Sequence, residues 1–154
     1  MTRNTPATAV HLNQTAVAAL IRADLKNDFP GVKFSVRSSR YSCGSSVRVE
    51  WTDGPVDDAV TKAIGRYMAQ GFDASTDSQT NSGPVQLRDG SWAKMYCYVS
   101  TRRNHSAELR ARVAAWFDRR FADCYAPGFD RETALYRRLR VACLAGGHLL
   151  IARD

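Results

Sequence analysis

The sequence predicts an α+β fold in which a mostly antiparallel sheet, built from two β-hairpins, packs with about four helices. Apolar residues recur at helical spacing in four segments and alternate with polar residues in two pairs of short segments. Gly, Pro or Asp-Gly separates these segments. The expected order of elements is therefore α-β-β-α-β-β-α-α-β.

The first helix is expected over residues 13–28, after a polar flexible arm at residues 1–11. Its inward face is marked by spacings of three and four residues. The helix should end at Phe29-Pro30-Gly31, because proline disfavours helix in the residue before it. The face consists of Val17, Leu20, Ile21, Asp24 and Leu25.

A β-hairpin follows, because the apolar period changes to two. Residues 32–37 and 47–51 form its strands, and residues 38–45 read as a long loop. Trp51 falls on the inward face, so we expect it to be nearly fully buried against the first two helices.

The second helix is expected to start at residues 52–55, where Thr52 or Asp53 can cap it, and to end at Gly71. Its buried stripe runs from Val56 to Met68. Residues 73–84 are polar without an apolar period and predict a mobile loop.

The second hairpin runs through residues 85–88, a turn at Asp89-Gly90 and a return strand at residues 92–100. Ala93, Met95, Cys97 and Val99 share one face of that strand, and Trp92, Lys94, Tyr96 and Tyr98 share the other. Burial of the aromatic face beneath the last two helices is the favoured interpretation. Stacking of nucleic-acid bases on exposed rings is the alternative.

Two arginine-rich helices are expected from about residue 104 or 106 to 123 and over residues 130–145, followed by a last strand at residues 148–152. Residues 12–154 should form one α+β domain. Within it, residues 12–73 would form an α-β-β-α core, and residues 84–154 a hairpin with the two helices.

The charge of the chain restricts its partners. The 154 residues carry a formal net charge of +7, which excludes an acidic mimic of DNA. Residues 101–154 contain 11 arginines, no lysine and 6 acids, and guanidinium groups bind phosphate or carboxylate bidentately. Nucleic acid, an acidic protein surface or an anionic membrane would suit this charge. A solvated helix face explains the arginines equally well.

No catalytic or metal motif is present in the sequence. The four cysteines have no metal-binding spacing, and the three histidines lie in no known catalytic pattern. We therefore expect a non-enzymatic protein without cofactor or metal. Residues 1–10 lack a signal-like apolar region and no stretch is long enough to span a membrane, so we expect a cytoplasmic protein with reduced thiols.

The first hairpin is the main candidate for partner binding, because the tip of a hairpin is hard to bury. Cys43 in its loop reads as a small turn residue; the alternative is a thiol activated by Arg40. The partner-binding candidates are Lys33, Arg37, Arg40, Tyr41 and Arg48. Secondary candidates are Lys94, Tyr96, Tyr98, Arg110, Arg137 and Arg138.

The stretch that begins at Phe34 and ends at Pro55 resembles the core signature of large polyvalent protein associated domains. Gly44-Ser45-Ser46 and Trp51-Thr52-Asp53-Gly54-Pro55 fit the signature, whereas Cys43 departs from it. Such domains occur in long multidomain proteins of phages and conjugative elements and in short stand-alone proteins. The resemblance implies that the protein helps mobile DNA to survive in a new host. It supplies no catalytic residues.

The leading functional hypothesis is a non-enzymatic protein of a mobile element that counters a host defence system, of the anti-CRISPR or anti-restriction type. It would act by binding an acidic protein surface of the defence complex or nucleic acid. The alternative is a DNA- or RNA-binding factor that protects transferred DNA without inhibiting a host enzyme. An enzyme acting on the defence chemistry is a third possibility. The oligomeric state does not follow from the sequence.

Overall fold

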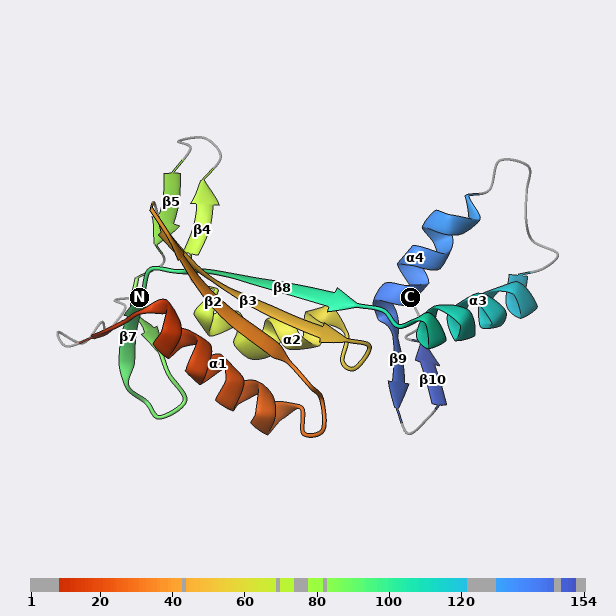
Figure 1. The fold of residues 1–154 in the computed structure, drawn as a ribbon, viewed down its shortest axis with the longest axis horizontal. Helices are drawn as coiled ribbons and strands as arrows, with labels where there is room; N and C mark the ends of the chain where they lie inside the picture. Colours follow the sequence, from red (N-terminus) through yellow and green to blue (C-terminus); the bar gives the residue numbers. More distant parts are fainter. Residues whose placement is uncertain are drawn as a thin grey trace, which may run out of the picture.

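The computed structural model describes residues 9–42, 44–68, 70–73, 78–81, 83–121, 130–145 and 148–151. The predicted α+β class is confirmed, with mostly antiparallel strand pairs divided among small sheets (Figure 1). In chain order the elements are β1 (Val10–Leu12), α1 (Gln14–Asp28), β2 (Ser35–Tyr41), β3 (Gly44–Thr52), α2 (Asp57–Ile64), a 3₁₀ helix (Gly65–Tyr67), β4 (Gln70–Asp73), β5 (Ser78–Asn81), β6 (Val85–Gln86), β7 (Trp92–Met95), β8 (Tyr98–Asn104), α3 (Ala107–Phe121), α4 (Arg131–Val141), β9 (Ala142–Ala145) and β10 (His148–Ile151).

Helix α1 forms where the sequence predicts it. Asn13 caps it, because its side-chain oxygen accepts a hydrogen bond of 2.9 Å from the backbone N–H of Ala16. Val17, Ile21, Asp24 and Leu25 of the expected inward face are buried, whereas Leu20 is half-buried. Residues 1–8 of the expected arm lie outside the described residues, whereas Val10 and His11 belong to β1.

The central sheet has the order β2-β3-β8. The predicted long loop at residues 38–45 is wrong, because β2 and β3 stay paired out to Tyr41 and Gly44. Serine-rich strands lack the apolar alternation that marks a strand, yet their backbone groups pair as well as any others. Cys43 lies outside the described residues.

The predicted return strand at residues 92–100 divides into two strands. β7 pairs antiparallel with β6, as expected, and parallel with β1. β8 instead pairs parallel with β3, from Tyr98 opposite Ser46 to Asn104 opposite Thr52. The predicted alternation is confirmed on the inward side, where all four residues are buried. They are Ala93, Met95, Cys97 and Val99.

Helices α1 and α2 supply the core against one side of the central sheet. Val17, Ile21, Val60 and Ile64 pack with the inward residues of β2, β3 and β8. Trp51 is 2% exposed within this cluster, as predicted. The favoured interpretation that the last two helices bury the aromatic face is wrong, because Tyr96 and Tyr98 are each 54% exposed. Those helices pack around a separate core.

Helix α2 is shorter than predicted. It starts at Asp57 after Val56 without a side-chain cap, and it ends at Ile64. Asp53 does not cap it, because its φ of 57° takes it out of the helix path and its carboxylate bonds the N–H of Ser106. The predicted loop at residues 73–84 is wrong over β5, which pairs with β4.

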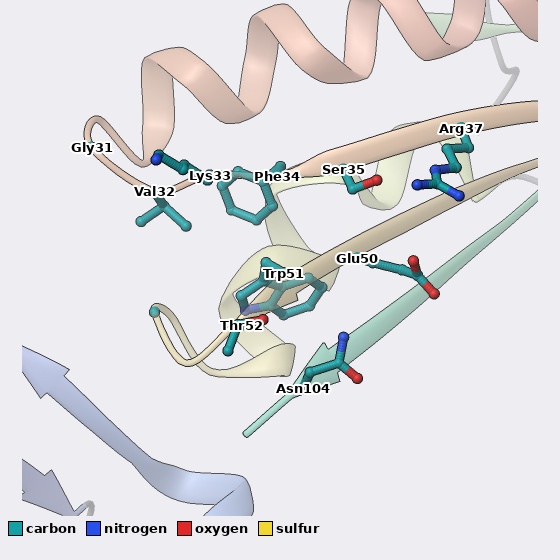
Figure 2. A pocket seen from close by; sticks show the side chains of 11 residues that line it. Gly31, Val32, Lys33, Phe34, Ser35, Arg37, Glu50, Trp51, Thr52 and Asn104 are labelled. Carbon is teal, nitrogen blue, oxygen red and sulfur yellow. The ribbon is translucent and has the colours of Figure 1, made fainter. Parts of the chain in front are cut away.

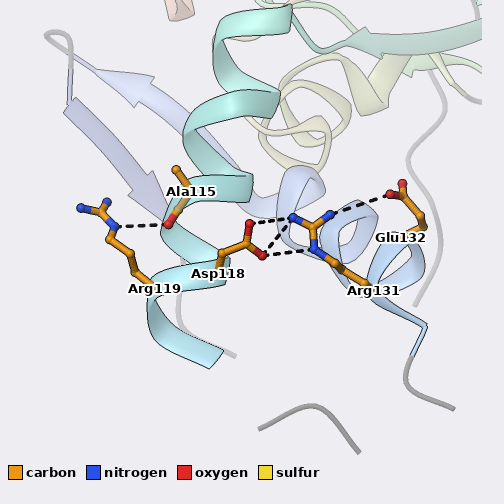
Figure 3. A network of polar contacts seen from close by, with 5 residues as sticks. All are labelled: Ala115, Asp118, Arg119, Arg131 and Glu132. Atoms are coloured by element: carbon orange, nitrogen blue, oxygen red, sulfur yellow. Dashed lines mark hydrogen bonds and ion pairs between the residues drawn. The ribbon is translucent and has the colours of Figure 1, made fainter. Parts of the chain in front are cut away.

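The C-terminal elements form a second core, beyond the end of β8 (Figure 1). Leu109, Val113 and Phe117 of α3 meet Leu135 of α4 there. The predicted helix at residues 130–145 ends at Val141, because β9 pairs antiparallel with β10 across the Gly-Gly dipeptide. Arg131 adds a clamp between the helices, since its guanidinium bonds both carboxylate oxygens of Asp118 at 2.7 and 2.9 Å (Figure 3).

Candidate nucleic-acid interface

One side of the central sheet carries polar and aromatic side chains that none of the described helices covers. The strand register places these side chains on the side opposite α1 and α2, since neighbours along a strand alternate between faces. Most of them are exposed. We call this surface the open face; its residues are Ser35, Arg37, Ser39, Tyr41, Ser46, Arg48, Glu50, Thr52, Tyr98, Ser100, Arg102 and Asn104.

Three arginines give the open face its charge. Arg37 lies directly opposite Arg48 in the register, and Arg102 lies one row away, opposite Glu50. Like charges in directly opposite positions destabilise a sheet. None of the three arginines forms an ion pair within the described part of the chain. An anionic partner would relieve the repulsion between Arg37 and Arg48.

Two tyrosines lie on the same face. Tyr98 is opposite Ser46, diagonal to Arg48, and is 54% exposed. Tyr41, 49% exposed, lies at the end of β2 with its ring against Gly44, where an added Cβ would come within 3.2 Å of that ring. In proteins that bind single-stranded nucleic acid, exposed rings stack on the bases and nearby guanidinium groups neutralise the phosphates.

A pocket of about 820 Å³ opens at the end of the open face near the start of β2 (Figure 2). Polar groups of the three strands line it together with Phe34 and the buried edge of Trp51, whose rings lie 5.7 Å apart. Lys33 and Arg37 are its cations and Glu50 is its carboxylate. The pocket therefore extends the open face with a patch of aromatic wall.

The residues of the Trp51–Pro55 signature serve the fold rather than this face. The indole N–H of Trp51 donates to the Pro55 carbonyl at 2.9 Å. Asp53 accepts from the N–H of Ser106 at 2.8 Å, and its own N–H donates to the Asn104 carbonyl. Gly54 has φ 50° and lies so close to Val32 that an added Cβ would come within 3.2 Å. The signature thus ties β3 to the end of β8 and the start of α3.

Arg103 joins the two cores. Its guanidinium donates to the carbonyls of Asp53 and Gly54 on one side and to those of Leu139, Arg140 and Ala142 on the other. Burial lowers the pKa of Arg103. The carbonyls at the C-terminal end of α4 favour a cation there. This side chain is therefore a structural bridge and is not free for a partner.

His105 lies beside this bridge. Burial, followed by the nearby charges of Arg103 and Arg110, lowers the pKa of His105, so its ring is neutral at pH 7. Its Nε2 is buried and has no hydrogen-bond partner among the described residues. Leaving such an atom unpaired costs about 1–3 kcal/mol.

The structure separates the residues of the predicted hairpin site. Arg37, Tyr41 and Arg48 come together on the open face, and Lys33 lines its pocket. Arg40 is exposed but alternates with Tyr41 and Arg37 along β2, so it lies on the opposite side of the strand.

The secondary candidates are dispersed. Tyr98 joins the open face, whereas Tyr96 stacks on the ring of His11 at 5.5 Å and Lys94 is half-buried. Arg110 lines cavities near α4, while Arg137 is exposed on α4 and Arg138 is half-buried. Sequence reasoning missed Arg102; continuing the alternation past Ser100 would have placed it on the same face as Tyr98.

Three findings concern metal binding, thiols and membrane spans. Within the described ranges, no group of three or more His, Cys, Asp or Glu residues could hold a metal ion. Cys97 and Cys143 are free thiols, and burial raises the pKa of Cys97. Among the helices that the structure describes, none combines the length and apolar character needed to cross a membrane.

The fold and the open face define a small α+β domain that presents a cationic, tyrosine-bearing sheet surface. Residues 12–106 match the model of large polyvalent protein associated domain 29, and the chain belongs to this family, which is linked to large polyvalent proteins of mobile elements. The match ends at Ser106, whose backbone N–H donates a hydrogen bond to the carboxylate of Asp53. No curated protein matches the chain, and no solved structure does.

Proposed function

We propose that this protein is a non-enzymatic accessory protein of a mobile genetic element that binds single-stranded nucleic acid on the open face. The observation that carries the proposal is that Arg37, Arg48 and Arg102 share with Tyr98 a sheet surface that none of the described helices covers. Guanidinium groups would hold the phosphates and the tyrosine ring would stack a base.

We propose that its biological role is to counter a host defence system of the anti-CRISPR or anti-restriction type; the link of the family to mobile elements supplies the context for this proposal. A basic protein bound to the nucleic acid that the defence complex must reach would obstruct the complex without catalysing a reaction. A second candidate is direct binding to an acidic protein surface of that complex, since the same unpaired arginines would pair with carboxylates. A third role, protection of transferred DNA, would use the same face.

Fluorescence anisotropy with a labelled single-stranded oligonucleotide tests the binding. Arg37→Glu with Arg48→Glu should weaken binding by more than about tenfold, as expected for anchor residues. The matched control is Arg119→Glu with Arg120→Glu, which makes the same change of charge on exposed positions of α3. The control should remain within about threefold of the wild type, since it leaves the face intact.

Salt dependence gives a second, independent measure. For single strands, each phosphate contact contributes about −0.7 to the slope of log affinity against log salt, so the double variant should lose about 1.4 of that slope. Absence of any DNA or RNA binding at low salt would refute the nucleic-acid proposal and leave the acidic protein surface.

A titration of the protein against the inhibited defence system tests the mechanism. Complete inhibition should require about one copy per target, because a binder acts by occupancy. Inhibition at far lower ratios would mean that the protein is a catalyst.

A further inference from the structure

Two cavities adjoin where the end of β8 meets α3 and α4. Their volumes are about 480 and 550 Å³, within the range of small-ligand sites. Both are lined by His105, Arg110 and Tyr136, so the two form one divided site. We call this site the junction pocket.

The smaller cavity is cationic. Arg102, Arg110 and Arg140 line it, and Asp57 is the carboxylate among its lining residues. Arg103 also lines it, but its donors are occupied by backbone carbonyls. Within the described residues, none of the other three arginines forms an ion pair. Converging guanidinium forks suit a phosphate group, which they bind bidentately.

The larger cavity has an apolar wall. Its lining includes Ala111, Ala114, Leu135 and Leu139, beside the ring of Tyr136, which is 61% exposed. Besides Arg110, its charged lining residues are Arg131 and Glu132, which lie 3.9 Å apart as an ion pair. A nucleobase would fit this wall, because its flat ring face stacks on aromatic and apolar side chains.

We propose that the junction pocket binds a nucleoside phosphate, with its phosphate between Arg102, Arg110 and Arg140 and its base against the apolar wall. The site goes beyond the proposed function, because most of its residues follow the matched region 12–106, and Arg102 and Asn104 are the lining residues that it shares with the open face. A free nucleotide and the phosphorylated end of a strand share this chemistry.

The walls of the pocket are held in place before any ligand arrives. Arg103 bonds the carbonyls at the end of α4, and Arg131 bonds Asp118 of α3 through a bidentate pair. Arg103 fixes α4 relative to β8, and the pair of Arg131 with Asp118 fixes α3 relative to α4. Such preorganisation favours binding because less order has to be created.

Isothermal titration with adenosine 5′-monophosphate and with inorganic phosphate tests the site. Arg110→Ala with Arg140→Ala should weaken nucleotide binding by more than about tenfold. The control, Arg120→Ala with Arg137→Ala, removes the same charge from exposed positions of the same two helices that line neither cavity, and it should bind as the wild type does. Equal losses in both variants, or no nucleotide binding to the wild type, would overturn the proposal.

A second variant keeps the test decisive if loss of the arginines unfolds the C-terminal helices. Ala111→Trp adds a ring at an exposed position on the rim of the apolar cavity, so it should weaken nucleotide binding and leave phosphate binding unchanged. Inorganic phosphate that binds as tightly as the nucleotide would refute the role of the apolar wall.

An oligonucleotide with and without a 5′-phosphate separates the two sources of the ligand. If the wild type prefers the phosphorylated strand and Arg110→Ala with Arg140→Ala abolishes this preference, the ligand is the end of a strand. Binding of the mononucleotide without such a preference assigns the free nucleotide. The Arg37→Glu with Arg48→Glu variant should retain mononucleotide binding, which distinguishes failure of this site from failure of the open face.

Discussion

Replacing Arg103 by alanine should weaken the attachment of α3 and α4 to the rest of the domain, which lies within the matched residues 12–106. Its guanidinium reaches five backbone carbonyls, two in the turn after β3 and three around the end of α4. The two hydrophobic cores share no buried residue. The bridge therefore links two regions whose hydrophobic cores are separate.

The magnitude follows from the bonds that are lost. Four of the five are partly buried, those to Asp53, Gly54, Leu139 and Ala142. At roughly 1 kcal/mol net for each partly buried bond, the loss is about 4 kcal/mol. The bond to Arg140 is exposed, so water replaces it at little cost. Lysine at this position keeps the charge but cannot fork, and it should restore less than half of the loss.

Hydrogen exchange and urea unfolding measure this effect. In Arg103→Ala, amides of α4 and β9 should exchange faster, while those of α1 keep their protection, because α1 belongs to the other core. Arg22→Ala is a control: Arg22 also donates to a backbone carbonyl, that of Val36, but within the first core. A loss below about 1 kcal/mol, or equal loss of protection in α1 and α4, would refute the bridging role.

Three further predictions concern the core, alkaline stability and the open face. Trp51→Ala should cost about 3–5 kcal/mol in urea unfolding, because the side chain is 2% exposed; a loss under about 1 kcal/mol would contradict this packing. Burial, followed by the hydrogen bond to Asp24, raises the pKa of Tyr67 above its ordinary value of 10.0. The resulting stability is complete below about pH 10 and is lost as the pH rises further, so the destabilisation by Tyr67→Phe measured at about pH 7 should shrink at about pH 11. A difference in unfolding free energy between the wild type and Tyr67→Phe that did not change with pH would refute the raised pKa of Tyr67. Arg37→Glu should weaken oligonucleotide binding more than Arg40→Glu, which lies on the other side of β2, and both should leave the melting temperature nearly unchanged; equal effects on binding would argue against the open face.

Local patterns predicted the elements whose causes are local. The cap at Asn13 and the stop after Asp28 lie within a turn of the helix that they bound, so the prediction of α1 was accurate. The alternation from Ala93 to Val99 likewise identified the buried side of β7 and β8. The sequence did not reveal that β8 leaves its hairpin to pair with β3, because a parallel partner about fifty residues away leaves no local mark.

Non-local pairing also explains the errors in helix length and in the site. Residues 142–145 have helical composition, but they extend because residues 148–151 offer a strand partner. Arg102 and Arg103 are neighbours of identical type with opposite roles. Strand alternation separates their faces, and only the fold shows that five carbonyls surround one of them while the other is unpaired within the described residues.

The residues that carry the family signature therefore fall into two groups with different physical roles. Trp51 and Asp53 form hydrogen bonds at the junction of β3, β8 and α3, and Gly54 adopts the positive φ that the turn there requires. Arg37 and Arg48 satisfy no internal partner among the described residues, and they repel each other across the sheet. A fold gains nothing from that repulsion, whereas an anionic ligand converts it into attraction. The first group explains how the domain is built, and the second indicates where it binds.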